Sequence, residues 1–312
     1  MSLTSIPVLS LDMPKAEFAQ AIGESFRTFG FAMVKDFPID RTLIDRAMAM
    51  SKEFFALPDE EKRRYHDPVG GGARGYTPFG VEIAKDAKHH DLKEFWHIGR
   101  DLPVGSPLAD ASMPPNVWPD RPEGFQELFT ELYRQYDATG AKILSAIALY
   151  LGLDEHWFDA GIEDGNSVMR LLHYPPIENL EGEAIRAGAH GDINLITLLL
   201  GAEEAGLELL FQGKEWMNAS PPEGAMVINC GDMLERLTNH YLPSTIHRVR
   251  NPNAERAAFS RYSMPFFLHL RSDFPIKTLP QCITADNPDR YPQPITADQF
   301  LQQRLREIGL KK

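Results

Sequence analysis

The second half of the chain constrains the fold most strongly, because short apolar runs recur there between residues that interrupt regular structure. Such runs, separated by Gly, Pro and Asn, are typical of β-strands. Many short strands at this spacing predict a sandwich or a barrel. The runs are Val168–Leu172, Leu195–Leu200, Leu207–Phe211, Ala225–Asn229, Ile246–Val249 and Ser260–Leu270.

The first half carries helical patterns as well as strands. Apolar spacing predicts helices at Pro14–Phe29, Asp40–Phe55 and Gly124–Leu151, and a short helix from Asp154. Near the other end of the chain, a further helix is expected over Thr296–Ile308. Short strands are expected at Ile6–Leu11, Phe31–Val34, Ala73–Tyr76 and Asp91–Gly99. The charged run Asp59–Arg64 predicts a solvated turn of helix. With no clear linker, residues 1–312 are expected to form a single domain, in which about 1–165 wrap a barrel core at about 166–275, followed by a helical tail.

Charge and cysteine content exclude some partners and compartments. The formal net charge of −12 argues against a nucleic-acid partner or an anionic membrane surface, because either would be repelled. Only two cysteines, Cys230 and Cys282, occur in 312 residues, which favours a reducing compartment over a disulfide scaffold. The sequence contains no basic leader before an apolar core and no apolar run as long as a membrane span. A cytoplasmic protein is expected.

A candidate metal site begins at His190-Gly191-Asp192, directly before an apolar strand-like run. Since alternate side chains along a strand share a face, His190 and Asp192 are expected to point the same way. Our candidate for a third ligand is His247. Two His and one carboxylate on one face of an octahedral metal, with the other face open, are typical of non-haem Fe(II) oxygenases.

Other histidines fit structural roles better. His89-His90-Asp91 lies in a polar, lysine-flanked segment that predicts a solvated loop. His173 and His269 alternate with apolar neighbours and are expected to be hydrogen-bonded barrel residues. His97 could face the cavity, and its role is left open. The remaining candidates, which lie among turn and helix-end residues, are His66, His156 and His240.

The preference for His247 depends on Arg261-Tyr262-Ser263, which follows fourteen residues later inside a strand-like run. By the alternation of a strand, Arg261 and Ser263 share a face. A guanidinium binds a carboxylate through two parallel N–H···O bonds, and a neighbouring hydroxyl satisfies a further lone pair. Such a carboxylate-binding pair close to a metal is what a keto-acid cosubstrate requires.

Several segments in order resemble one family. Gly231–Asn239, Ser244–Val249 and Arg261–Ser263 are similar to the isopenicillin-N-synthase-like branch of the 2-oxoglutarate/Fe(II)-dependent dioxygenases, which includes gibberellin oxidases. The likeness extends over most of the chain, to Ile6–Val8, Phe29–Phe31 and Met169–Pro176. Its His-x-Asp, distant His and Arg-x-Ser fall on the residues singled out above.

The resemblance implies a mainly β fold with flanking helices: a double-stranded β-helix (jelly roll) core packed by N-terminal helices and one long helix. It implies that Fe(II), 2-oxoglutarate and O2 are used to hydroxylate or desaturate a small organic molecule, with succinate and CO2 as coproducts. It also implies that Tyr174 reaches the cosubstrate carboxylate. Many plant members carry Asn two residues before that Tyr, where this chain has Leu172, so His173 or a water is expected to replace the contact.

The substrate is a small molecule, and an acidic one is favoured if Arg74 or Lys93 points inward. Monomer and homodimer are both compatible with the sequence. The proline-rich segment 102–122 and the tail after Asp286 are candidate lids. Side chains expected near the barrel mouth, and therefore candidate pocket walls, are Arg74, Tyr76, Phe79, Phe95, Trp96 and Phe267.

Two alternatives to this function remain open at the level of sequence. A redox-inert metal in a cupin-like jelly roll would give a hydrolase, an isomerase or a binding protein, but such a protein has no use for Arg261 and Ser263 as a carboxylate-binding pair. A cosubstrate-free Fe(II) oxidase of the same fold is the closer alternative, and Leu172 favours it slightly.

Overall fold

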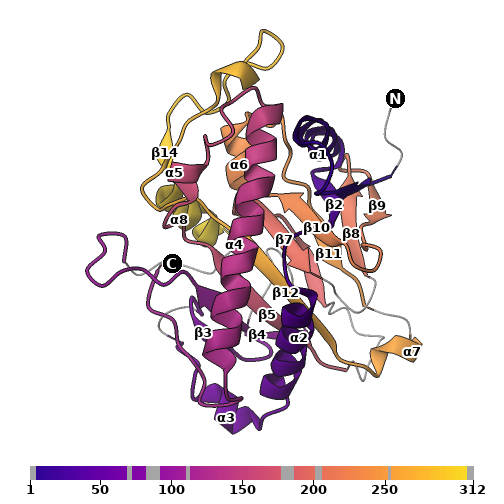
Figure 1. Ribbon diagram of the computed structural model, residues 1–312, viewed down its shortest axis with the longest axis vertical. Coiled ribbons are helices and arrows are strands. Elements are labelled where there is room, and N and C mark those ends of the chain that lie inside the picture. Colours follow the sequence, from indigo (N-terminus) through magenta and orange to yellow (C-terminus); the bar gives the residue numbers. More distant parts are fainter. Residues whose placement is uncertain are drawn as a thin grey trace.

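The computed structural model describes residues 5–68, 72–81, 92–109, 113–176, 186–200, 206–251 and 254–307. The helices there are α1 (Lys15–Phe29), α2 (Arg41–Phe55), α3 (Asp59–Arg63), α4 (Phe125–Tyr150), α5 (Asp159–Ile162), α6 (Asp232–Leu237), α7 (Ala254–Ala257) and α8 (Ala297–Glu307). The helix α4 runs along most of the long axis of the molecule across one face of a large sheet, with α1 and α2 beside it (Figure 1). The predicted long helix is therefore the main cover of that sheet.

Two antiparallel sheets form the barrel. The eight-stranded sheet has the order β1 (Val8–Ser10), β2 (Phe31–Lys35), β10 (Met226–Cys230), β7 (Ile196–Leu200), β12 (Arg261–Leu268), β5 (Val168–Tyr174), β4 (Glu94–Gly99) and β3 (Gly75–Thr77), with only β1 and β2 parallel among these. The four-stranded sheet has the order β6 (Ala187–His190), β11 (His247–Val249), β8 (Leu207–Phe211) and β9 (Glu215–Asn218). A short pair, β13 (Pro275–Ile276) and β14 (Ile295–Thr296), lies apart.

The eight-stranded sheet is buried on both faces, and the alternation of β12 separates them. Met264 and Phe266 belong to the larger core, where Phe266 stacks on Tyr136 of α4 at 5.2 Å between ring centroids. The opposite face, called the inner face below, packs against the four-stranded sheet through Phe31, Leu172 and other members of a second core. The predicted mainly β architecture with flanking helices is confirmed.

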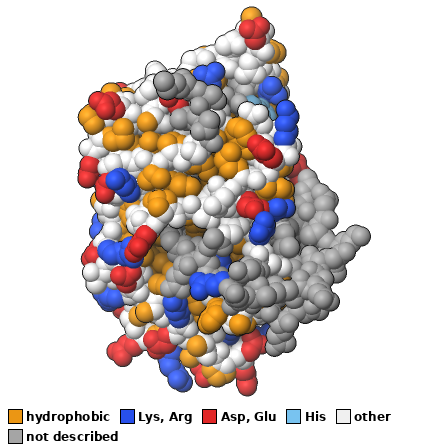
Figure 2. Space-filling view, turned by 90° about the vertical axis from the view of Figure 1, so that its right-hand side faces the viewer, with side chains coloured by type: hydrophobic (Ala, Val, Ile, Leu, Met, Phe, Trp, Pro, Cys, Tyr) orange, Lys and Arg blue, Asp and Glu red, His pale blue; other side chains and the backbone are white. Residues whose placement is uncertain are grey.

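The four-stranded sheet is covered less completely. Leu210 and Trp216 alternate with inward-facing neighbours and remain partly exposed, and Arg248 stacks over Trp216 with Cζ 3.8 Å from a ring centroid. On this side of the molecule, hydrophobic side chains gather in a band across the upper half, bordered by acidic and basic groups (Figure 2). Arg248 therefore lies on the outside of the barrel, away from the inner face.

Gly30 ends α1 as the sequence predicts, and the structure explains why glycine is needed. Its φ is +69°, in the left-handed region that favours glycine. A Cβ there would also approach the side chain of Thr245 and come within 2.6 Å of the carbonyl oxygen of Pro243. The end of α1 therefore packs directly on the loop that precedes His247.

Some expectations need correction. The strand β9 was not predicted, because Glu215–Asn218 is too polar to stand out as an apolar run. The charged run at α3 is not wholly solvated: Lys62 is buried and its Nζ lies 2.7 Å from Oε2 of Glu94. The short helix expected from Asp154 begins at Asp159.

Candidate metal centre

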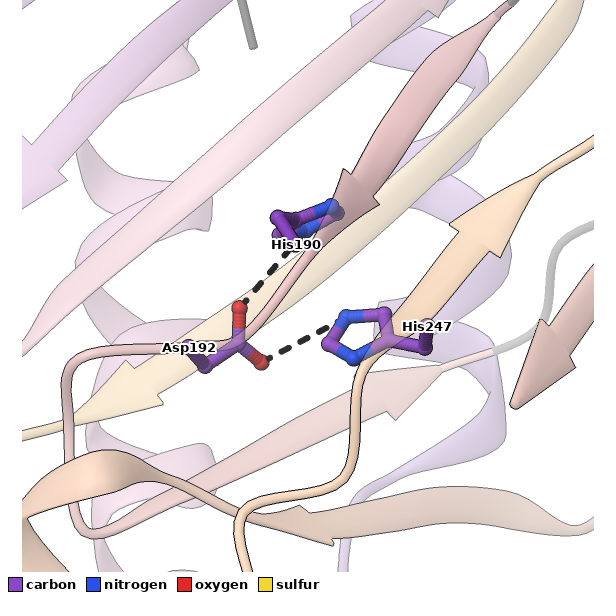
Figure 3. A group of neighbouring side chains, drawn as sticks. All are labelled: His190, Asp192 and His247. Atoms are coloured by element: carbon purple, nitrogen blue, oxygen red, sulfur yellow. Dashed lines mark ion pairs between the residues drawn. The ribbon is translucent and has the colours of Figure 1, made fainter. Parts of the chain in front are cut away.

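Three side chains, called the metal corner below, converge at the inside of the barrel: His190, Asp192 and His247 (Figure 3). Their potential ligand atoms all lie within 4.8 Å of one another. Nε2 of His190 lies 3.8 Å from Oδ1 of Asp192, and Nε2 of His247 lies 3.8 Å from Oδ2. These separations are too long for hydrogen bonds, and they suit ligands that surround a common ion.

Their positions follow from a crossover between the sheets. His190 ends β6 in the four-stranded sheet, whereas β7 of the eight-stranded sheet starts only at Ile196. His190 and Asp192 were expected to share a face of one strand, but Asp192 lies in the crossover itself, so strand alternation is not what brings them together. His247 is the cross-strand partner of His190, which places the two ring centroids 4.4 Å apart.

Backbone carbonyls fix the tautomers of both imidazoles. Nδ1 of His190 lies 2.7 Å from the carbonyl oxygen of Gly188, and Nδ1 of His247 lies 3.2 Å from that of Thr245. A carbonyl only accepts, so each Nδ1 carries a proton and donates it. Each Nε2 is left with a lone pair on the side of Asp192, which is the state that binds a metal.

Asp192 is held as a carboxylate. Its Oδ2 accepts hydrogen bonds from Oγ1 of Thr197 at 2.5 Å and from Nδ2 of Asn229 at 2.8 Å. Burial by itself would raise the pKa of Asp192, but the two histidines and these two donors outweigh it and lower the pKa. The carboxyl group is therefore ionised and oriented before any ion binds.

His190 is more open than its partners, with 40% of its side chain exposed against 9% for His247 and 6% for Asp192. Desolvation first, and then the neighbouring His247, lower the pKa of His190; the charge of Lys93 contributes in the same direction. His190 is therefore neutral near pH 7. Two neutral imidazoles and one carboxylate make the donor set of a facial Fe(II) site, so the residues present fit that ion.

Behind the metal corner, the predicted carboxylate-binding residues lie on the inner face. Arg261 and Ser263 are 1% and 2% exposed. The cross-strand partner of Arg261 is Tyr174, and its guanidinium Cζ lies 5.0 Å from the centroid of the Tyr174 ring. These three side chains are called the clamp below. Leu172 is the partner of Ser263, so an apolar side chain stands beside the hydroxyl.

His173 does not replace the contact that Leu172 lacks. Its Nδ1 lies 2.7 Å from Oε1 of Glu94 and its Nε2 lies 2.9 Å from Oγ of Ser260. Both partners lie on the helix side of the sheet, where His173 also stacks between Phe55 and Tyr262. The expectation is therefore wrong for His173, because consecutive residues of a strand face opposite sides.

The candidate pocket walls divide between the two faces. Tyr76 and Trp96 are fully buried in the larger core beneath α2 and α4, so the structure places both away from the metal corner. Phe95 belongs to the inner-face core. Phe267 is partly buried and follows Phe266, whose side chain faces α4, so it too lies on the inner face. Phe79 is 46% exposed in a turn.

Arg74 is buried against the inner side of Gly99, since a Cβ on Gly99 would coincide with the Arg74 guanidinium. The segment after β4 is tied to the same place: Gly99 N donates to Oδ1 of Asn116 at 2.8 Å, and Nδ2 of Asn116 donates to Gly99 O at 2.8 Å. The candidate lid at 102–122 is thus fastened through Asn116 to the end of β4, the strand next to the edge of the sheet.

The remaining histidines lie outside the metal corner. His97 faces inward, where its ring contacts Arg170. His269 is buried, but its Nδ1 has no hydrogen-bond partner among the described residues, contrary to expectation. His89 and His90 fall outside the described residues. The three that the sequence places among turn and helix-end residues make other contacts: His66 with Tyr76 O, His156 with Asp159, and His240 with Tyr291.

Sequence reasoning missed the two residues that orient Asp192. Thr197 and Asn229 each stand as a polar side chain within an otherwise apolar strand, β7 and β10. Both are buried, at 4% each. A buried polar residue within an apolar run requires a hydrogen-bond partner, and that was the available signal.

Comparison with known proteins identifies the family. Residues 6–121 match the model described as the N-terminal region of non-haem dioxygenase in morphine synthesis, and residues 165–270 match the 2OG-Fe(II) oxygenase superfamily. The chain is 35% identical to the 2-oxoglutarate-Fe(II) type oxidoreductase hxnY of Emericella nidulans, over 92% of this chain and 84% of that protein. These matches span most of the described barrel.

Solved structures agree. A 2OG-Fe(II) oxygenase family protein from Caulobacter crescentus is 56% identical, with a TM-score of 0.91 over 98% of this chain and 100% of that one. A full-length Neurospora crassa protein, crystallised in complex with alpha-KG, is 30% identical, with a TM-score of 0.85 over 96% and 95%. The same Neurospora protein has been crystallised with thymine. No helix among the described residues has the length and apolar character needed to cross a bilayer. The predicted family, fold and cofactors, Fe(II), 2-oxoglutarate and O2, are thus confirmed, and this chain belongs to the 2-oxoglutarate- and Fe(II)-dependent oxygenases.

Proposed function

We propose that the metal corner of this oxygenase holds Fe(II), that the clamp binds 2-oxoglutarate, and that the substrate is a small carboxylic acid. One observation carries the first assignment: three ligand atoms lie within 4.8 Å of one another, while both Nδ1 atoms are committed to backbone carbonyls. When bound, Fe(II) with 2-oxoglutarate and O2 supplies the oxidation of a substrate C–H bond, by hydroxylation or desaturation, with succinate and CO2 as coproducts.

The protein's own contribution is placement and exclusion of water. Arg261 presents a planar pair of donors to a carboxylate, while the hydroxyls of Ser263 and Tyr174 donate further hydrogen bonds. All three are at most 3% exposed, so the charge-assisted bonds form in a medium of low dielectric. The apolar Leu172 beside them keeps water from the same carboxylate.

Replacing Arg261 with Met tests the clamp. Under anaerobic conditions, addition of Fe(II) and 2-oxoglutarate to the wild type is expected to give the weak visible charge-transfer band of a chelated keto acid. Arg261→Met should require at least about tenfold more 2-oxoglutarate for the same band, since one buried charge-assisted contact is lost. Arg248→Met, which removes a guanidinium outside the barrel, should titrate like the wild type.

The same titration of the wild type distinguishes a 2-oxoglutarate-dependent oxygenase from a cosubstrate-free oxidase. Absence of the band, together with no succinate after air is admitted, would favour the cosubstrate-free oxidase of the same fold. An Arg261→Met protein that binds 2-oxoglutarate as the wild type does would show that the clamp has been assigned to the wrong residue. Metal content, measured on the same samples, separates loss of the ion from loss of the cosubstrate.

A further proposal concerns the residues that line the substrate pocket. Phe95 and Phe267 are proposed to line the substrate pocket, with Arg74 at its edge; Tyr76 is not, because it packs on the other side of the sheet.

We propose one domain over residues 1–312, because the eight-stranded sheet takes strands from both halves of the chain. A cytoplasmic location is proposed because Cys230 and Cys282 are free buried thiols. Monomer and homodimer both remain compatible with this function.

A further inference from the structure

A second guanidinium lies on the inner face, separate from the clamp. Arg170 of β5 is half-buried, and its cross-strand partner is His97 of β4. Its Cζ lies 4.3 Å from the ring centroid of Phe95 and 5.4 Å from that of Phe267. Arg170 therefore lies against two aromatic rings, a common setting for a guanidinium that is partly desolvated.

This group is close to the metal corner. Phe267 is the cross-strand partner of Thr197, whose hydroxyl donates to Asp192. The strands β5, β12 and β7 are consecutive neighbours, and adjacent strands lie about 4.8 Å apart, so β5 and β7 are about 10 Å apart. A small molecule that touches Arg170 at one end and Phe267 along its length therefore reaches the metal corner.

The orientation of Arg170 is fixed by His97. Nε of Arg170 lies 2.5 Å from Nε2 of His97, and an arginine can only donate, so Nε2 of His97 accepts. The proton of His97 must then be on Nδ1, which lies 2.6 Å from the carbonyl oxygen of Gly72. One of the five N–H donors of the Arg170 guanidinium is thereby bonded to His97, and this bond fixes the plane of the guanidinium.

The surroundings on this side of the sheet are cationic. Lys93, directly before β4, is 8% exposed. The guanidinium of Arg74 lies over Gly99, two residues beyond His97 on β4. Arg74, one of the two cations whose inward orientation would favour an acidic substrate, therefore lies on the inner side.

We propose that Arg170, positioned by His97, binds the carboxylate of a small acidic substrate whose apolar body lies along Phe267, so that a C–H bond is presented at the metal corner. This inference rests on the proposed function, which supplies the chemistry at that corner. Arg170 thus recognises the substrate, whereas the clamp recognises the cosubstrate. His97 is a positioning residue and does not touch the substrate.

The test uses pairs of probes that differ only in charge. The protein is loaded anaerobically with Fe(II) and 2-oxoglutarate, and each acid is compared with its primary amide: benzoate, phenylacetate, cyclohexanecarboxylate and hexanoate. Binding is measured by calorimetry and by the change in the visible band. In the wild type, at least one acid should bind at least about tenfold more tightly than its amide, the effect of one charge-assisted contact.

Arg170→Met should reduce affinity for that acid by about 10- to 100-fold while leaving its amide within about threefold. Affinity for 2-oxoglutarate should stay within about threefold, because the clamp is intact. Arg170→Lys keeps the charge but loses the planar bond to His97, and should give an intermediate preference. His97→Phe keeps a ring but removes the acceptor, and should lower the preference for acid over amide without abolishing binding.

Two outcomes would overturn the inference: no acid bound more tightly than its amide by the wild type, or a preference that survives in Arg170→Met. The first comparison needs no variant, so a misfolded variant cannot obscure it. If the visible band is normal and the preference is absent, this inference fails while the proposed function stands. If the band itself is absent, the proposed function fails, and calorimetry still reports the binding of the probes.

Discussion

The eight-stranded sheet separates two clusters that each combine imidazole with carboxylate. On the helix side, called the ion cluster below, Glu94 accepts from Lys62, His173 and Tyr76, and Nε2 of His173 contacts the hydroxyl of Ser260. The bond from His173 to Glu94 is 2.7 Å long. In the metal corner, by contrast, imidazole and carboxylate stand 3.8 Å apart. In the ion cluster the side chains hydrogen-bond directly to one another, whereas in the metal corner the ligand atoms are far enough apart to surround an ion.

The difference shows what makes a histidine available as a ligand. In the ion cluster both ring nitrogens of His173 are committed to side chains, so no lone pair remains for a metal. In the metal corner backbone carbonyls take one nitrogen of each ring, and Thr197 and Asn229 take one oxygen of Asp192. The partners in the metal corner therefore orient the ligands without using them up.

The largest expected effect comes from the same substitution made in each cluster. His247→Ala should abolish retention of Fe(II), with loss of at least about a thousandfold in affinity, because two remaining ligands do not hold a catalytic ion. His173→Ala should retain iron at the wild-type stoichiometry. The measurement is metal content after anaerobic loading and desalting, with circular dichroism to establish that both variants fold.

His247→Gln provides a second variant should alanine disturb β11, which carries this residue at its first position. Normal iron retention by a folded His247→Ala protein would mean that the third ligand lies elsewhere. Loss of iron from folded His173→Ala would show that the two clusters are not independent.

The next effect is on stability, and it belongs to the ion cluster. Glu94→Ala leaves the buried ammonium of Lys62, which is 6% exposed, without its carboxylate. Breaking a buried pair from one side costs about 3–5 kcal/mol. The double variant Lys62→Met/Glu94→Gln removes both charges and should lose clearly less free energy of unfolding than the sum of the losses in Lys62→Met alone and Glu94→Gln alone. Urea unfolding measures each free energy.

Iron retention by folded Glu94→Ala should be unchanged, since Glu94 faces α2 and α3 and not the metal corner. A loss of unfolding free energy below about 1 kcal/mol in this variant, the range of exposed pairs, would contradict a buried role for the pair.

The two clusters also show how far the sequence could predict this protein. Apolar spacing located most strands of the barrel, though not the polar β9, and it located the long helix α4; motif order located His190, Asp192 and His247. That reasoning could not predict which side chains of β3 and β4 point toward the metal corner and which point toward the helices. Both faces of the eight-stranded sheet are buried, so Tyr76 and Phe95 are both buried although they lie on opposite faces. Alternation says that neighbours differ in face, but not which face meets the metal.

The same limit applies to residues that act through others. Lys62 lies in a charged run that predicts exposure, and only the tertiary approach of β4 supplies Glu94 as its partner. Arg170 lies in a segment that the family resemblance covers, but its contact with His97 joins residues 73 positions apart. Such contacts depend on sheet order, which short-range patterns do not contain.

The smallest effect expected concerns the donors to Asp192. Thr197→Val preserves shape but removes the hydroxyl that lies 2.5 Å from Oδ2 of Asp192. Loss of such a supporting contact costs about 10- to 100-fold in metal affinity. The matched control is Thr139→Val in α4, where an equally buried hydroxyl donates to Gln135 O and has no link to the metal corner. Competition titration with a metal chelator measures both.

The pH dependence of this loss distinguishes an electrostatic role for Thr197 from simple packing. Thr197 and Asn229 both contribute to lowering the pKa of Asp192, so removal of the hydroxyl should raise it. Since only the ionised carboxyl binds the metal, protons should compete more effectively in Thr197→Val as the pH falls. The deficit relative to the wild type should therefore grow as the pH falls toward about 4, the ordinary range of an aspartate, and should be nearly constant between about pH 6 and pH 7. A deficit that does not change with pH would mean that Thr197 supports the site through shape alone, and that the ionisation of Asp192 is secured by the histidines without it.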